Sequence, residues 1–192
     1  MSSMFDGCSN LTTIPQLDTS NVTNMYGMFM NCTNLTTIPQ LDTSKVTNMT
    51  NMFFYCSNIT TIPQLDTSNV ATMSQIFLSC SALESVEGID FSGLTSNLES
   101  LFGWDSDKPN LTHFIVNGKI NVSISDDWSI KALTAIDYDS VKSILAAADR
   151  TDNTNAKELA FNRTMTDQNG ELAALVSSCT SKGWTITGLT LQ

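Results

Sequence analysis

Apolar residues recur along the chain with a period of 24 residues, from Met4 to about Phe102. The clearest copy runs from Met28 to Asn51, and its neighbours follow it nearly residue for residue. The positions that keep the spacing are phenylalanines (Phe5, Phe29, Phe53, Phe77), cysteines (Cys8, Cys32, Cys56, Cys80) and aliphatic residues (Leu11, Leu35, Ile59, Leu83). A fixed period of about 20 to 50 residues is typical of a solenoid, in which one supersecondary unit stacks on copies of itself.

Two hydrophobic rhythms within each repeat predict a short helix and a short strand. The helix is expected to begin near Ser20, because Asp18 and its neighbours can accept hydrogen bonds from the first free backbone N–H groups. Its apolar residues are spaced at i, i+3, i+6 and i+7, which places them on one face: Val22, Met25, Met28 and Phe29. The other half, residues 11–17, is rich in β-branched residues and favours a strand that ends or kinks at Pro15.

Regularity fades in the fourth copy, where Glu87 replaces the proline and the next phenylalanine, Phe102, comes one residue late. We expect the helix or its loop to absorb this insertion, so that stacking continues with altered geometry. The sequence therefore predicts a repeat solenoid over residues 1–103 and a C-terminal part, residues 104–192, that closes the stack. The first copy begins in mid-repeat, and since an uncapped solenoid end exposes apolar surface, we expect missing sequence or another subunit to cover it.

The C-terminal part keeps an alternation of strands and helices without the repeat signature. Its predicted elements are a hairpin of strands 111–116 and 119–124 around the turn Asn117-Gly118, a strand within 129–136, a helix over 139–148 capped by Asp137 or Asp139, a strand over 158–161, a helix over 168–181 with Gly183 as C-cap, and a strand over 184–191. The predicted fold class is α/β: a leucine-rich-repeat-type solenoid with short strands and short helices, closed by a C-terminal α/β cap of degenerate repeats.

The repeat has the signature MFxxCxxL…LDTSxVTxM, which stands here as Met28-Phe29, Cys32, Leu35, Leu41 to Ser44, Val46-Thr47 and Met49. Over roughly the first hundred residues it resembles the leucine-rich-type repeats of BspA-like bacterial surface proteins. The resemblance implies a horseshoe or straight solenoid used for adhesion or recognition on cell surfaces or phage particles, with no catalytic residues. More loosely, the segments 157–161 and 182–186 resemble the tails of related bacterial and phage sequences.

Charge narrows the choice of partner. Up to Ser100 the chain has eight acidic residues and a single base, Lys45, within a net charge of −10 for the whole sequence. Because phosphate backbones and anionic lipids require basic groups, this distribution disfavours nucleic acid and anionic membrane surfaces. No apolar run reaches the length of about 18 residues that suggests a membrane span, and the N-terminus lacks the pattern of a signal peptide.

Two columns of identical polar or reactive residues are candidates for chemistry. The cysteine column could form disulfides on distance alone, since stacked coils lie about 4.8 Å apart. Parallel side chains in register point the wrong way for a bridge, however, so we favour buried free thiols, with no metal site. The aspartates Asp18, Asp42, Asp66 and Asp90 are predicted to cap the helices, with a calcium ladder as the alternative.

The threonine pairs and glutamines of the predicted strands are the candidate binding residues. They are Thr12, Thr13, Gln16, Thr36, Thr37, Gln40, Thr60, Thr61 and Gln64, which we call the display face. Between buried leucine and isoleucine positions they should point outward and form a flat polar array that contacts a protein or glycan receptor. The alternative is an ordinary solvated strand face; the TxT pattern of ice-binding solenoids is missing.

Catalytic motifs do not stand out. His113 is a lone histidine, which is usually structural or exposed, and the acidic pairs Asp105/Asp107 and Asp126/Asp127 lie in loop-like sequence. The sequence thus predicts a non-enzymatic recognition or adhesion module without cofactor, located outside the cell, at a cell surface or on a virion. The alternative is a structural subunit of a phage tail fibre or other virion appendage.

Overall fold

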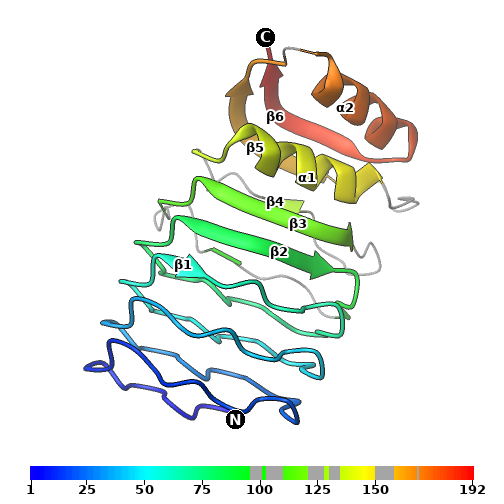
Figure 1. Ribbon diagram of the computed structural model, residues 1–192. Helices are drawn as coiled ribbons and strands as arrows, with labels where there is room; N and C mark the ends of the chain where they lie inside the picture. Colours follow the sequence, from blue (N-terminus) through cyan, green and yellow to red (C-terminus); the bar gives the residue numbers. More distant parts are fainter. Residues whose placement is uncertain (96–100, 103–109, 121–127, 130–134, 150–157, 168) are drawn as a thin grey trace.

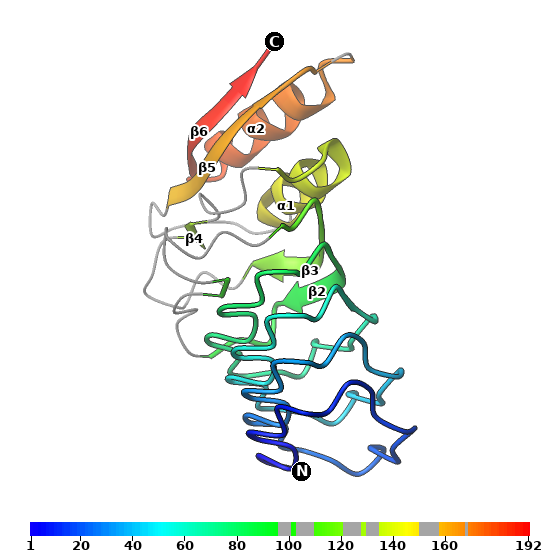
Figure 2. The same ribbon diagram turned by 90° about the vertical axis from the view of Figure 1, so that its left-hand side faces the viewer.

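The computed structural model describes residues 1–95, 101–102, 110–120, 128–129, 135–149, 158–167 and 169–192. Successive turns of the chain lie above one another, from the N-terminal coils to the helices at the C-terminal end (Figure 1). A view turned by 90° shows the same stack from its side (Figure 2). Equivalent residues of neighbouring coils are 24 apart, as in the parallel bridges that join Asn24 to Asn48 and Asn48 to Thr72.

The described strands form two parallel sheets of three strands each. The first has the order β1-β2-β3, with β1 at Thr61–Ile62, β2 at Ser85–Phe91 and β3 at His113–Ile120. The second has the order β4-β5-β6, with β4 at Trp128–Ser129, β5 at Glu158–Met165 and β6 at Thr185–Leu191. Helix α1 at Tyr138–Asp149 packs against β3 and against α2 at Glu171–Ser181. The architecture is therefore α/β with small parallel sheets.

The helix predicted for each repeat is wrong in the three copies whose turn region lies within the described residues. Residues 26–31 form turns, and Gly27 and Asn31 have positive φ angles of 55° and 60°, which a right-handed helix cannot contain. Their N–H groups donate across to the next coil, as from Gly27 to the carbonyl of Thr50 at 2.9 Å. Because the neighbouring coil satisfies these donors, the backbone does not need i to i−4 bonds. The same apolar spacing that predicts a helix also buries Met28 and Phe29 in this turn conformation.

The strand predicted for each repeat forms only partly. Residues 11–17 and 35–41 are in the coil path but form no strand, whereas the fourth coil, where Glu87 stands in place of proline, carries the seven-residue β2. Proline has no N–H for a ladder bond, which explains the difference. Glutamine side chains supply a substitute, since the amide of Gln16 donates to the carbonyl of Gln40 at 2.8 Å.

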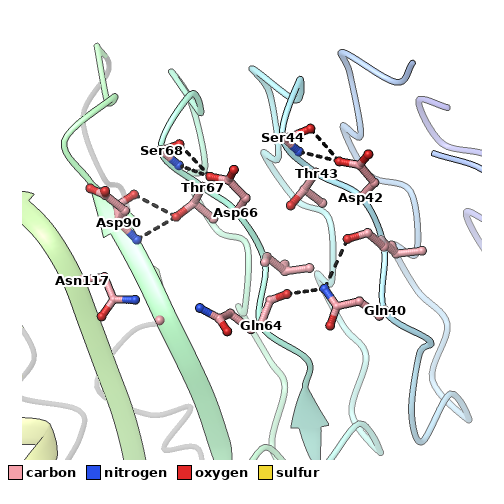
Figure 3. A pocket seen from close by; sticks show the side chains of 13 residues that line it. Gln40, Asp42, Thr43, Ser44, Gln64, Asp66, Thr67, Ser68, Asp90 and Asn117 are labelled. Atoms are coloured by element: carbon pink, nitrogen blue, oxygen red, sulfur yellow. Dashed lines mark hydrogen bonds between the residues drawn. The ribbon is translucent and has the colours of Figure 1, made fainter. Parts of the chain in front are cut away.

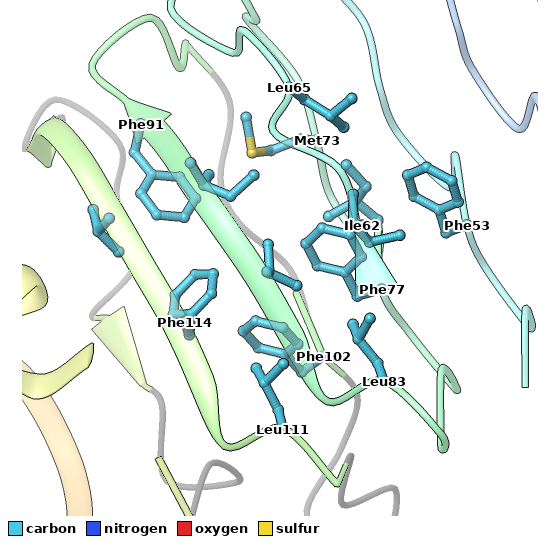
Figure 4. Close-up of a cluster of buried hydrophobic side chains, with 14 of the residues drawn as sticks. Phe53, Ile62, Leu65, Met73, Phe77, Leu83, Phe91, Phe102, Leu111 and Phe114 are labelled. Atoms are coloured by element: carbon cyan, nitrogen blue, oxygen red, sulfur yellow. The ribbon is translucent and has the colours of Figure 1, made fainter. Parts of the chain in front are cut away.

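A phenylalanine column runs through the core and fixes the stacking of the coils (Figure 4). Its rings are near parallel, with centroids 5.6 to 6.0 Å apart, in the order Phe5, Phe29, Phe53, Phe77 and Phe102. The late phenylalanine thus continues the stack, as predicted, at an interplanar angle of 19°. Phe114 of β3 meets Phe102 edge-on at 5.0 Å, so the core passes without a break into the C-terminal part.

The C-terminal predictions hold for the helices but not for the hairpin. The helix predicted over 139–148 is confirmed as α1, and Asp137 caps it by accepting from the N–H of Ser140 at 2.8 Å. The predicted elements over 158–161, 168–181 and 184–191 correspond to β5, α2 and β6. The residues predicted as a turn, Asn117-Gly118, lie inside β3, where Gly118 has a φ of +66° at an irregularity of the ladder. Of the strand predicted within 129–136, β4 includes Ser129, and residues 130–134 lie outside the described ones.

Candidate recognition groove

The display face lies at the surface, as expected. Of its nine residues, Thr60 is partly buried and the others are exposed. Several of them also brace neighbouring coils: Thr36 donates through its hydroxyl to the carbonyl of Thr12 at 3.2 Å, and Gln40 donates through its amide to the carbonyl of Gln64 at 2.5 Å. The amides of Gln16 and Gln40 are therefore used within the fold, and a binding role for the display face stays a prediction.

A groove of about 540 Å³ crosses several coils beside this face (Figure 3). It is lined by Gln40, Leu41, Asp42, Thr43, Ser44, Gln64, Leu65, Asp66, Thr67, Ser68, Gly88, Asp90 and Asn117. Its size falls within the range of about 300 to 1,000 Å³ that is usual for small-molecule sites. The lining brings together amides, hydroxyls and carboxylates from successive coils, so the groove is polar and acidic.

The aspartates of the groove close turns instead of capping helices. Asp42 accepts from the N–H and the hydroxyl of Ser44 at 3.1 and 2.6 Å, and Asp66 makes the same two contacts with Ser68. Helix capping by these residues is thus wrong, because their repeats contain no helix, but the carboxylate does cap a local turn. The hydroxyl and N–H of Ser44 lower the pKa of Asp42, so this carboxylate is ionised at neutral pH.

A break in the repeat pattern opens one end of the groove. Gly88 stands at the repeat position occupied by Gln16, Gln40 and Gln64, and its φ is +69°. A Cβ atom on Gly88 would lie 2.8 Å from Nδ2 of Asn117 and 3.1 Å from Nε2 of Gln64. Both amides are exposed, and neither has a hydrogen-bond partner among the residues that the structure describes.

Sequence reasoning missed Asn117 as a groove residue. It was predicted as a hairpin turn residue, whereas the register of β2 with β3 places it opposite Asp90. The available signal was the loss of the repeat's glutamine at Gly88, in the same fourth copy in which Glu87 replaces the proline. That loss marks where the regular lattice is interrupted.

The cysteine column consists of free thiols, as favoured from the sequence. Cys32, Cys56 and Cys80 are buried, and each Sγ donates at 3.1 Å to the carbonyl of the phenylalanine in the preceding coil. Burial raises the pKa of Cys32 to about 11 and that of Cys80 to about 12. These thiols are therefore protonated core residues and not nucleophiles.

The imidazole ring of His113 lies between two carboxylates. Its Nδ1 lies 2.6 Å from Asp137 and its Nε2 lies 3.1 Å from Glu87, so both ring nitrogens are engaged by carboxylates on opposite sides. The hydrogen bond with Asp137 raises the pKa of the imidazole. The acidic residues Asp105, Asp107, Asp126 and Asp127 lie outside the described residues, and the described part of the chain holds no metal-binding cluster of three or more His, Cys, Asp or Glu side chains.

Comparison with known families finds a match over the repeat coils. The family model described as "Mycoplasma protein of unknown function, DUF285" matches residues 1–114, which is more than half of the chain. The chain belongs to the DUF285 family. The match covers the repeat coils and reaches into β3 of this DUF285 protein. No curated protein and no solved structure matches the chain. Among the described residues, no helix has the length and apolar character needed to span a membrane.

Proposed function

We propose that this DUF285 protein is a BspA-like, leucine-rich-repeat-type solenoid, residues 1–103, closed by a C-terminal cap, residues 104–192, and that it serves as a non-enzymatic recognition module. It presents its repeat surface to a protein or glycan receptor at a bacterial cell surface or on a phage particle. The observation that carries this proposal is the groove, which collects polar groups from successive coils at fixed spacing. The stacked phenylalanine column supports it, because a continuous core keeps that spacing rigid.

The test is saturable binding of the labelled chain to cells. Fluorescently labelled protein is mixed with animal epithelial cells and with bacterial cells, and bound fluorescence is measured by flow cytometry with and without an excess of unlabelled chain. We expect competed, saturable binding to at least one cell type. The absence of competed binding to every cell type would overturn the recognition proposal.

The second candidate is a structural subunit of a phage tail fibre or other virion appendage. It is favoured by the bonding between coils, in which a backbone N–H of one coil donates to a carbonyl of the next, as from Phe29 to Met52 at 2.9 Å. A stack held in this way is a rigid spacer, which suits a fibre subunit. Sedimentation velocity separates the candidates, because a symmetric multimer without cell binding supports the structural role, and a monomer that binds cells supports recognition.

A further inference from the structure

The turns of the second, third and fourth coils alternate between buried residues and outward-facing pairs. In the third coil the buried positions are Met49, Met52, Phe53 and Cys56. The pairs between them, residues 50–51 and 54–55, are partly or fully exposed. Backbone hydrogen bonds join these turns from coil to coil, as from Asn31 to the carbonyl of Phe54 at 2.8 Å. The outward sides of residues 26–31, 50–55 and 74–79 therefore form one continuous surface, which we call the turn face.

The turn face carries large apolar side chains that lie outside the core. Tyr26 and Tyr55 are 37 % and 49 % exposed, and Met30 and Phe54 are partly buried. None of these four belongs to the described hydrophobic core or to the partly buried residues packed against it. The rings of Phe54 and Tyr55 instead pack on each other, with centroids 4.8 Å apart. Because large apolar side chains gathered on a surface mark sites of association, the turn face is a candidate contact surface.

The turn face is uncharged, whereas the chain as a whole has a net charge of −10. The turn segments without any charged residue are 24–34, 48–58 and 72–82. The nearest charge in the first coil is Asp6, which accepts a hydrogen bond from Nδ2 of Asn31 at 3.2 Å. Two copies of an acidic chain repel each other where their carboxylates meet, as they would at the groove with Asp42 and Asp66. On the turn face two copies can meet without that repulsion, and its Tyr, Phe and Met residues are those enriched at the centres of interfaces.

We propose that the turn face is the contact surface of a symmetric dimer of this chain. The proposal goes beyond the recognition function and does not depend on it. A two-fold axis that crosses the stack between the second and third coils places Met30 of each chain against Phe54 of its copy. The two contacts between a sulfur atom and an aromatic ring are then equivalent, as the interface of a two-fold dimer requires.

The spacing of the coils favours a second copy over other partners. Met30 and Phe54 occupy the same repeat position in neighbouring coils, which hydrogen-bond to each other at the strand spacing of about 4.8 Å. A second copy has the same spacing, so its side chains can fit between those of the first at each successive coil. An extended peptide rises about 3.3 Å per residue and would lose this register.

The dimer leaves the proposed recognition surfaces accessible. The turn face contains no residue of the display face, and none of its residues lines the groove. A dimer presents two display faces, so its binding to a cell surface is bivalent and gains avidity without new contacts. A dimer that also binds cells would therefore support both proposals.

The experiment measures the oligomeric state of the full chain by sedimentation velocity over about a hundredfold range of concentration. Phe54→Asp adds a charge to the turn face, and Asp6 already stands at this repeat position in the first coil. Tyr55→Asn removes a ring, and Asn31 occupies the equivalent position with the same φ of 60°. Thr13→Asp is the matched control, because it adds the same charge at an exposed position of the display face. Circular dichroism verifies that each variant is folded.

We expect the unmodified chain to form a dimer as its concentration rises. Phe54→Asp should raise the dissociation constant of the dimer by about a hundredfold or more, because each chain then buries an unpaired carboxylate at the interface. Tyr55→Asn should raise it about tenfold through the loss of an aromatic contact, and Thr13→Asp should leave it unchanged.

Three results would overturn the dimer. They are a chain that stays monomeric throughout the range, a multimer that resists both turn-face substitutions, and a multimer that Thr13→Asp dissociates as strongly as Phe54→Asp. If the chain is monomeric and Tyr55→Asn abolishes the competed binding to cells, the turn face contacts the receptor instead of a second copy. The recognition function then stands while the dimer fails, so the two proposals are tested separately.

Discussion

The regular N-terminal coils and the C-terminal part satisfy their backbone hydrogen-bonding groups in different ways. Both are parallel stacks, but the described residues of the first three coils contain no α-helix, whereas the C-terminal part contains α1 and α2. In the coils, backbone N–H groups bond to the neighbouring coil, as from Phe29 to Met52 at 2.9 Å. In the C-terminal part, helices satisfy their own backbone and cover the sheet with an apolar face. The difference shows that a repeat can dispense with helices when neighbouring coils and short turns together supply partners for its backbone groups.

The largest expected effect tests this dependence on neighbours. Phe53 is fully buried and stacks between Phe29 and Phe77, so Phe53→Ala leaves a cavity between two coils. We expect a loss of about 3 to 5 kcal/mol in the free energy of unfolding, measured by urea denaturation. Phe5→Ala is the matched control, because Phe5 is only partly buried and stacks on one side, and it should cost about half as much. Equal losses would contradict the coil-to-coil coupling.

The next expected effect is a difference in cysteine reactivity between the N-terminal end of the stack and its interior. Raising the pKa of Cys32 from 9.0 to about 11 reduces its thiolate fraction about a hundredfold at neutral pH. Cys8 is exposed, whereas Cys56, Cys80 and Cys179 are buried. We expect brief treatment with iodoacetamide to label Cys8 alone, and all five cysteines in denaturant, as read by mass spectrometry of peptides. Rapid native labelling of Cys56 would show that the coils open readily.

A smaller effect on stability is expected from substitutions at the residues with positive φ angles, which lie in the turns found where a helix was expected. The repeat places positive φ angles at Gly27 (55°) and Gln75 (58°), one a glycine and the other not. A left-handed conformation costs a non-glycine residue about 1 to 2 kcal/mol, so Gly27→Ala should destabilise by about that amount. Gln75→Gly should stabilise by up to about 1 kcal/mol, because part of the gain is lost to the flexibility of glycine in the unfolded chain.

A glycine substitution in a C-terminal helix is the control for Gln75→Gly, because there glycine should destabilise the fold. Ala173 lies exposed in α2, where glycine is a poor helix former, so Ala173→Gly should destabilise by about 1 kcal/mol. Thermal unfolding of the three variants gives the signs directly. Stabilisation by glycine in α2, or destabilisation by Gln75→Gly, would be incompatible with the backbone angles of the two regions.

The stacking of the coils could be predicted from the sequence because the same side chains recur at a fixed spacing. The phenylalanine column and the late entry of Phe102 follow from spacing alone, and α1 follows from a cap and a helical apolar face. The helix near Ser20 was predicted wrongly because apolar residues spaced like Met25 and Met28 can also be buried in a turn whose donors bond to another coil. That choice depends on contacts about 24 residues away, which local periodicity does not contain.

Only the groove residues that belong to the repeat could be predicted, because the others are brought there by tertiary contacts. Gln40 and Gln64 belong to the predicted display face, and their exposure follows from their place between buried residues. Asn117 lies outside the repeat and reaches the groove only through the register of β3 on β2. A two-residue Asn-Gly motif suggested a turn, and the parallel pairing that overrides it arises from the tertiary stack.

The smallest expected effect is the pH dependence of the junction between the two regions. His113 of β3 lies between Glu87 of β2 and Asp137 before α1, so its charge links the last regular coils to the first helix. The pKa of His113 is raised above its ordinary value of 6.5 by the hydrogen bond with Asp137. A raised pKa means that the folded state binds the proton more tightly than the unfolded state. The stabilisation is therefore complete below pH 6.5 and is lost as the pH rises through the higher folded pKa.

At acidic pH, protonation of Asp137 weakens its interaction with His113 and so reduces the stability of the fold. Partial burial opposes ionisation of Asp137, but hydrogen bonds from His113 and Ser140 outweigh it and lower its pKa below 3.8. The contribution of Asp137 is thus present above pH 3.8 and is lost as the pH falls through the lower folded pKa. Since ion pairs near a surface contribute up to about 1 kcal/mol, urea midpoints should show a shallow maximum between about pH 4 and 6.5. His113→Gln should remove the decline on the alkaline side, and an unchanged decline in this variant would assign it to another group.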